Sequence, residues 1–197
     1  PAAGGTADRL IVFVHGYGAD GNDLIGLGRH WQRLLPTAAF VSPHAPERCA
    51  MSPMGYQWFA ITRMQPDEML KGVERAAPIL NAFIDGELAR LNLDASKLVL
   101  VGFSQGTMMS LHIGLRRKVP PAAIVGFSGA LPGAEKLPAE IVGRPPVLLV
   151  HGDADEMIPV QALHAAVNGL GAAGVPARWH VSRGTGHGIA PDGLDLA

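Results

Sequence analysis

The 197-residue sequence predicts an α/β fold in which helices cover both faces of a mostly parallel central sheet. Two observations support this prediction. Short unbroken runs of β-branched and aliphatic residues are typical of strands that are buried on both faces. Longer segments, whose apolar residues recur every three or four positions, separate these runs and predict amphipathic helices. No internal repeat or linker interrupts the alternation, so we expect a single domain over residues 1–197.

Six segments carry the strand pattern, and the first and third of them lead into glycine-rich turns. The run at residues 9–14 ends at His15-Gly16, and the run at residues 97–102 ends beside a serine between two glycines. The last run is the least regular of the set. The six predicted strands are Arg9–Val14, Ala38–Ser42, Lys97–Gly102, Ala122–Phe127, Pro146–His151 and Ala177–Val181.

Three segments between the strands carry the helical pattern. In Asp67–Leu91 we expect Pro78 to kink or split the helix, because proline lacks the N–H that a helix interior needs. In Gln105–Lys118 the last residues are cations, which suit the negative end of a helix dipole, and Pro120-Pro121 follows. The third helix is predicted from Pro159 to about Leu170, since proline is favoured in a first turn.

Composition and charge exclude several classes of function. The chain has 16 Lys and Arg against 17 Asp and Glu, so its net charge of −1 offers no basic surface for nucleic acid. Cys49 is the only cysteine, which excludes an intramolecular disulfide framework and a cysteine-rich metal site. The apolar runs are far shorter than the roughly 18 residues that an integral membrane segment needs. Pro1–Gly5 has no basic or apolar targeting segment, and we expect a cytoplasmic protein.

The segment Gly102-Phe103-Ser104-Gln105-Gly106 matches the G-x-S-x-G pattern of a nucleophile elbow. The pattern alone is weak, but here a predicted buried strand precedes it and a predicted helix follows it at once. In such a turn the serine is exposed at a sharp bend, and side chains two residues away on either side would collide. Ser104 is therefore the candidate nucleophile. The alternative is an ordinary strand-to-helix turn that happens to contain a serine.

A serine hydroxyl needs a base and an acid, and in this fold class they follow in the order Ser, Asp or Glu, His. After one predicted strand, Asp153 and Asp155 lie where a carboxylate would project from the sheet edge. After the last strand, His187 lies among glycines that leave it room to reach the serine. Either aspartate could instead be a turn former or a helix N-cap, and His187 could be a surface histidine. The residues alone do not choose between the two aspartates.

The segment Gly16–Gly21 reads G-x-G-x-x-G after a strand, as dinucleotide-binding loops do. That interpretation also needs an acidic residue at the end of the next strand, and Ala38–Ser42 leads instead into Pro43-His44. We favour an oxyanion loop of the His-Gly-x-Gly type. It would supply the backbone N–H of Tyr17, while Gln105 after the nucleophile would supply a second one.

Together these motifs resemble the carboxylesterase/phospholipase family of α/β-hydrolases, which includes acyl-protein thioesterases and lysophospholipases. The resemblance runs from His15 to His187 and implies the α/β-hydrolase fold. It rests on His15-Gly16-Tyr17-Gly18, Trp58-Phe59, Gly102–Gly106, Phe127-Ser128-Gly129, His151–Asp155 with Ile158-Pro159, and Gly186-His187.

The resemblance also implies roles for individual residues. It makes Ser104 the nucleophile, His187 the base and Asp155 the acid, because Asp155 is the second aspartate of the family's H-G-x-x-D motif. It implies an oxyanion hole at Tyr17 and Gln105, with no cofactor and no metal. Two departures are visible. Ala60 stands where the family's W-F-D motif has its aspartate, and both ends look short of the usual N-terminal strand hairpin and final helix.

The segment Pro43–Pro66 is predicted to be a long irregular loop rich in Met, Trp and Pro. Its apolar side chains could bind an acyl chain, and we therefore predict substrate-binding roles for Trp58 and Phe59, and for Ser128 after a later strand. The alternative is that the loop's apolar residues are core. The same loop could equally mediate contacts in a homodimer.

These observations predict a serine hydrolase that cleaves small-molecule or lipid-like esters or thioesters through an acyl-enzyme. One alternative is an acyltransferase that uses the same three residues and passes the acyl group to an alcohol. Another is a non-catalytic ligand-binding module on the same fold, since a fold does not determine function.

Overall fold

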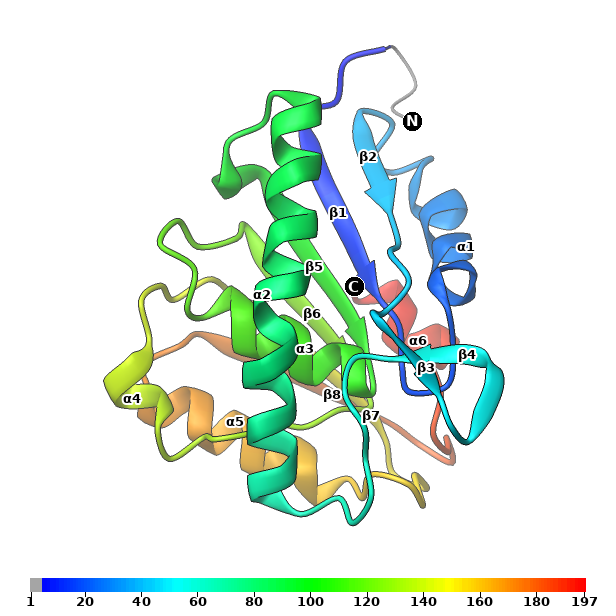
Figure 1. Ribbon diagram of the computed structural model, residues 1–197, viewed down its shortest axis with the longest axis vertical. Helices are drawn as coiled ribbons and strands as arrows, with labels where there is room; N and C mark the ends of the chain where they lie inside the picture. Colours follow the sequence, from blue (N-terminus) through cyan, green and yellow to red (C-terminus); the bar gives the residue numbers. More distant parts are fainter. Residues whose placement is uncertain (1–4) are drawn as a thin grey trace.

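The computed structural model describes residues 5–197, and its centre is a six-stranded sheet in which every neighbouring pair is parallel (Figure 1). The strand order is β2-β1-β5-β6-β7-β8. Its strands are β1 (Arg9–Val14), β2 (Ala38–Val41), β5 (Leu98–Phe103), β6 (Ala123–Phe127), β7 (Val147–Gly152) and β8 (Ala177–Ser182). The predicted α/β-hydrolase architecture is confirmed. Residues 1–4, where no targeting segment is expected, lie outside the described residues.

Helices pack on both faces of this sheet and create two hydrophobic cores. The larger core lies beneath α2, α3, α4 and α5, and the smaller one beneath α1 and α6 (Figure 1). The helices are α1 (Gly21–Trp31), α2 (Pro66–Leu91), α3 (Gln105–Gly114), α4 (Leu137–Glu140), α5 (Gln161–Ala172) and α6 (Pro191–Asp195), with a 3₁₀ turn at Ala95–Lys97. Among residues 5–197, no helix is long and apolar enough to cross a bilayer.

The predicted strands match the observed ones closely, because the central strands are unbroken apolar runs with most residues buried. β1 has the predicted bounds, and β5 begins and ends one residue later than predicted. The predicted kink or split at Pro78 does not divide α2, which runs from Pro66 to Leu91 as one element. Pro78 and Glu74, whose carbonyl the missing N–H leaves free, are both exposed, so water can take the place of that hydrogen bond.

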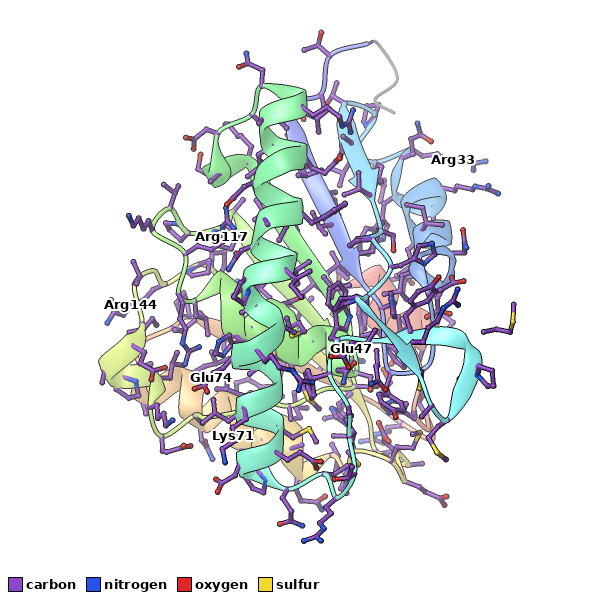
Figure 2. The ribbon with its side chains drawn as sticks, viewed as in Figure 1. Arg33, Glu47, Lys71, Glu74, Arg117 and Arg144 are labelled. Carbon is purple, nitrogen blue, oxygen red and sulfur yellow. The ribbon has the colours of Figure 1, made fainter. Side chains whose placement is uncertain are left out.

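Lys71 and Glu74 project outward from this helix (Figure 2), while its buried side contributes Val73, Leu80 and Ile84 to the larger core. The segment therefore has the amphipathic character that its apolar spacing predicts.

Three local predictions need correction. The segment Pro43–Pro66 is not irregular throughout, because β3 (Glu47–Cys49) and β4 (Ser52–Gln57) pair in it as an antiparallel hairpin. The helix α3 ends at Gly114 and not at Lys118, since the N–H groups of the next residues turn back to the Ile113 carbonyl. The helix α1 was not predicted. Its three glycines lower helix propensity, although Asp20 caps it by accepting a hydrogen bond from the N–H of Asn22 at 2.6 Å.

The sheet brings together segments that are far apart in the sequence. In a parallel sheet the carboxyl ends of the strands share one edge, and ligands bind in the crevice outside that edge. β1 ends there in His15-Gly16, β5 in Ser104, β7 in the segment with Asp155, and β8 in the segment with His187. The fold thus places all the predicted catalytic segments at the same end of the molecule (Figure 1).

His112 in α3 couples the stability of this core to pH. Its side chain is buried, and its Nδ1 has no hydrogen-bond partner among the described residues. Burial, with the nearby Arg116 guanidinium, lowers the pKa of His112 from 6.5 to about 4, while Glu140 opposes the shift. Between these two pH values, His112 is therefore protonated in the unfolded chain and neutral in the folded chain.

Stability is expected to be fully retained above pH 6.5 and to fall as pH drops toward 4, by on the order of 3 kcal/mol from this residue. Urea unfolding between pH 4 and 7 measures the slope. His112→Leu should flatten it, because leucine cannot be charged and leaves no unpaired polar atom. The matched variant His164→Gln removes an exposed histidine and should leave the slope intact. An unchanged slope in His112→Leu would contradict the assignment.

Candidate active site

Ser104 lies in the turn between β5 and α3, with the strained backbone of an elbow. Its φ of 53° and ψ of −117° lie in a region that residues other than glycine rarely adopt. Two hydrogen bonds hold the turn: the Ser104 N–H donates to the Phe127 carbonyl at 2.9 Å, and the Ser104 carbonyl accepts from the N–H of Thr107 at 3.0 Å. A Cβ on Gly106 would lie 1.8 Å from the Val14 carbonyl oxygen, so no larger residue fits there.

His187 and Asp155 meet across the ends of β8 and β7. The Nδ1 atom of His187 lies 2.8 Å from the Oδ2 atom of Asp155. A carboxylate only accepts hydrogen bonds, so Nδ1 carries the hydrogen and Nε2 is left unprotonated in the neutral ring. The His187 ring also contacts the ring of Phe103, the residue before Ser104, with their centroids 5.0 Å apart. The structure therefore brings His187 and Asp155 together beside the elbow.

The surroundings of Asp155 keep its carboxylate ionised. Its side chain is fully buried, and burial alone would raise its pKa. Hydrogen bonds from the N–H of Ile158, from His187 and from the N–H of Met157 outweigh that effect and hold the pKa below its usual value. Both backbone N–H groups bind the Oδ1 atom at 2.9 Å, which leaves Oδ2 to face His187. His151, which sequence reasoning did not single out, lies 3.3 Å from the same Oδ2.

Asp153 has a different place. Its Oδ1 accepts the N–H of Gly184 at 2.6 Å, at the start of the segment that carries His187. Ser128 supports the other end of that segment, since its hydroxyl donates to the Gly188 carbonyl at 3.2 Å. Ser128 is 1% exposed and has a φ of 47°, so it is a buried and strained residue. The predicted substrate contact at Ser128 finds no support in this placement, which instead makes it a support for the histidine loop.

Asp192 was missed by sequence reasoning, and it connects α6 to β8 at the two ends of the loop that carries His187. Its carboxylate faces the Nε2 atom of His180 at 2.8 Å and accepts the hydroxyl of Ser182 at 2.9 Å. These contacts, led by that with His180, hold the pKa of Asp192 below its usual value. They fasten the start of α6 to the end of β8, so the loop between them is closed at its base. No sequence motif marks this pair, whose members are 12 positions apart in the chain.

The predicted oxyanion groups lie on either side of the elbow. The loop that contains Tyr17 is tied to β4, because the Gly18 N–H donates to the Tyr56 carbonyl at 2.8 Å and the Tyr56 N–H donates to the Ala19 carbonyl at 2.7 Å. This loop packs closely on the nucleophile: a Cβ on Gly16 would lie 3.3 Å from the Cβ of Ser104. Within residues 5–197, the backbone N–H groups of Tyr17 and Gln105 donate no hydrogen bond. They are available to a ligand.

The predicted apolar substrate contacts are distributed differently from the expectation. Trp58 and Phe59 are 2% and 0% exposed and belong to the larger core. This placement matches the alternative that they are core residues. The methionines at positions 51 and 54 are instead more than 80% exposed on the hairpin. Ala60, which replaces the aspartate of the family motif, is exposed and lines a cleft of about 580 Å³ whose other lining residues include the charged Arg63 and Lys71.

Known proteins resemble this chain over most of its length. A family model described as phospholipase/carboxylesterase matches residues 2–197. The crystal structure of esterase PE8 aligns with a TM-score of 0.96 and 46% identity, covering 100% of this chain and 92% of that one. Acyl-protein thioesterase 1 of Gibberella zeae is 27% identical, covering 94% of this chain and 86% of its own. Acyl-protein thioesterase 1 of Schizosaccharomyces pombe is 30% identical, with coverages of 76% and 69%.

Proposed function

The chain belongs to the phospholipase/carboxylesterase family and is a carboxylic ester hydrolase, and from this premise we propose that Ser104, His187 and Asp155 form its catalytic triad. The observation that carries the proposal is the 2.8 Å contact between His187 Nδ1 and Asp155 Oδ2, beside a strained serine elbow. A buried carboxylate that holds one imidazole nitrogen leaves the other free to take the serine proton.

In the first step, His187 Nε2 removes the hydroxyl proton of Ser104 as the Oγ atom attacks the carbonyl carbon of an ester or thioester. The resulting oxyanion accepts hydrogen bonds from the backbone N–H groups of Tyr17 and Gln105, each worth about 3 kcal/mol in the transition state. When the tetrahedral intermediate collapses, the bond to the leaving group breaks, and His187 gives its proton to the departing alcohol or thiol. Ser104 then carries the acyl group.

In the second step, His187 removes a proton from water, whose oxygen attacks the acyl carbon. Collapse of the second tetrahedral intermediate releases the carboxylic acid and returns the proton to Ser104. Asp155 remains ionised throughout, because the N–H groups of Met157 and Ile158 and the His187 ring all stabilise its charge. None of these steps needs a metal or an organic cofactor.

The substrate class follows from the same family membership. Two relatives are named acyl-protein thioesterase, and a close structural match is named an esterase. We therefore assign this chain small or lipid-like acyl esters and thioesters. The buried positions of Trp58 and Phe59 favour a role for them in supporting the site over direct contact with the acyl chain.

The proposal is tested with a fluorophosphonate probe and a series of acyl substrates. The probe should label one residue, Ser104, because it mimics the tetrahedral intermediate and traps an activated serine. Rates of hydrolysis of 4-nitrophenyl esters from acetate to decanoate, and of the matching thioesters, should then give the preferred chain length. Labelling elsewhere, or substrate turnover that the bound probe does not block, would contradict the assignment.

A further inference from the structure

The side chain of Gln105 joins the elbow to the segment after β4. Gln105 follows the nucleophile directly and is 1% exposed. Its Oε1 accepts the backbone N–H of Trp58 at 2.8 Å, and its Nε2 donates to the carbonyl of Phe59 at 2.8 Å. The oxygen and the nitrogen of the side-chain amide are therefore both hydrogen-bonded to the backbone at Trp58-Phe59. Buried polar groups with every partner in place fix one conformation.

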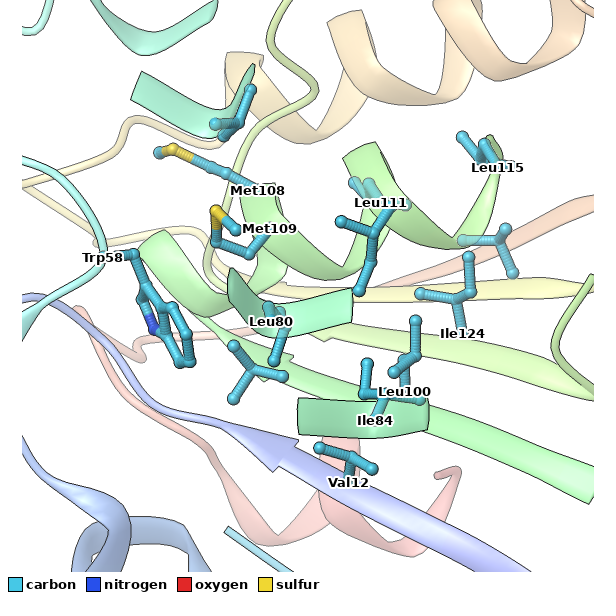
Figure 3. Packing of buried hydrophobic residues seen from close by; sticks show 14 of the residues in the cluster. Val12, Trp58, Leu80, Ile84, Leu100, Met108, Met109, Leu111, Leu115 and Ile124 are labelled. Carbon is cyan, nitrogen blue, oxygen red and sulfur yellow. The ribbon is translucent and has the colours of Figure 1, made fainter. Parts of the chain in front are cut away.

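The indole of Trp58 continues this connection to the other side of the site. Its Nε1 donates to the carbonyl of His15 at 3.0 Å. The ring is buried in the larger core, where Met109 and Leu80 lie beside it (Figure 3). A buried, packed ring cannot follow a movement of the loop, so the hydrogen bond holds the loop to a fixed point. The peptide that follows the His15 carbonyl leads directly to Gly16 and Tyr17.

His15 fixes the next peptide group. Its Nε2 accepts the N–H of Ala45 at 3.0 Å, and its Nδ1 lies 2.8 Å from the Gly16 carbonyl. Because the Ala45 N–H only donates, Nδ1 carries the hydrogen and donates to Gly16. Burial lowers the pKa of His15, which favours this neutral form. The Gly16 carbonyl and the Tyr17 N–H belong to one planar peptide. Fixing the carbonyl therefore aims the N–H, and polarising it strengthens the N–H as a donor.

We propose that the side chains of His15, Trp58 and Gln105 form an oxyanion strut, a continuous hydrogen-bonded path that sets the spacing and direction of the two N–H groups at Tyr17 and Gln105. The inference rests on the proposed function. These three are positioning residues: their side chains touch neither the reacting carbonyl nor the serine oxygen, and act through backbone N–H groups that do. Transition-state stabilisation depends on donors placed within a few tenths of an ångström, which is why such a path matters.

The first test is Trp58→Phe, which removes the indole N–H and keeps an aromatic ring in the core. The strut predicts a fall in kcat of about tenfold or more, with KM within twofold, and the same loss for every acyl length. Affinity for a trifluoromethyl ketone, which forms an oxyanion on the enzyme, should fall by the same factor. Trp179→Phe makes the same change at a half-exposed ring on β8 and should leave both values unchanged. A raised KM confined to long acyl chains, or an unchanged kcat, would overturn the strut.

The second test keeps the proposal falsifiable should Trp58→Phe fold poorly. In Gln105→Glu, a protonated carboxyl can still donate to the Phe59 carbonyl, whereas a carboxylate would face that oxygen with no hydrogen. The kcat of Gln105→Glu, divided by the kcat of the parent enzyme at the same pH, should therefore fall at least fivefold as pH rises from 5 to 8. A ratio independent of pH would remove Gln105 from the strut. Fluorophosphonate labelling of the parent enzyme at Ser104 establishes the underlying function separately.

Discussion

Ser104→Ala is expected to lower kcat/KM for ester hydrolysis by about 10⁴-fold or more. The hydroxyl is the atom that forms the covalent bond, and no neighbouring group can replace it. The residual rate would come from the oxyanion N–H groups and from substrate binding alone. Initial rates on 4-nitrophenyl butyrate, at enzyme concentrations high enough to detect one part in 10⁵, measure the loss.

Ser110→Ala is the matched control for this prediction. Ser110 lies in α3, the helix that follows Ser104; it is fully buried, and its hydroxyl has no hydrogen-bond partner among residues 5–197. Its removal leaves no partner unsatisfied, so activity should stay within twofold of the parent. Circular dichroism of both variants shows whether the fold is kept. If Ser104→Ala retained more than about one hundredth of the activity, another residue would have to be the nucleophile.

The strands and the order of the catalytic segments could be predicted from sequence because each depends on local pattern. A run such as Leu98–Phe103 has both faces buried, so every residue in it is apolar or small. The elbow needs glycine at 102 and 106, because a side chain at either position would collide with nearby backbone, and these glycines are visible in the sequence. The α1 helix escaped prediction because its three glycines, the first of which ends the G-x-G-x-x-G pattern, conceal a helical spacing of buried residues.

The direction in which a loop side chain points could not be predicted, because it depends on partners far away in the chain. The sequence left Trp58 between an acyl-binding role and a core position, and its hydrogen-bond partners are 43 and 47 residues distant in the chain. Ser128 follows a strand at the active edge, yet its hydroxyl reaches a carbonyl 60 residues later. The choice between Asp153 and Asp155 could not be made from the residues alone, because the two aspartates are two positions apart and occupy equivalent places in the pattern. The family resemblance implies Asp155, and in the structure Asp153 contacts Gly184 whereas Asp155 contacts His187.

Asp155→Asn is expected to lower kcat by about 10⁴-fold at neutral pH while leaving the fold intact. The asparagine oxygen can keep the hydrogen bonds from Met157 and Ile158, which directs its NH₂ group toward Nδ1 of His187. A donor at that place requires an unprotonated Nδ1, so the neutral ring carries its hydrogen on Nε2. In that tautomer His187 cannot accept the proton of Ser104. The ring keeps its position, but its unprotonated nitrogen is Nδ1, which faces the substituted side chain at position 155, and not Nε2, which has to accept the proton of Ser104.

Asp153→Asn separates this effect from simple loss of a negative charge near the histidine loop. Asparagine at 153 can still accept the Gly184 N–H through its oxygen, and the residue has no contact with the His187 ring in the described structure. We therefore expect less than a tenfold loss of kcat, although the same charge is removed two residues from Asp155. Rate measurements from pH 6 to 9 on both variants decide the matter. Equal losses in the two would show that the site responds to net charge, and the tautomer argument for Asp155 would then fail.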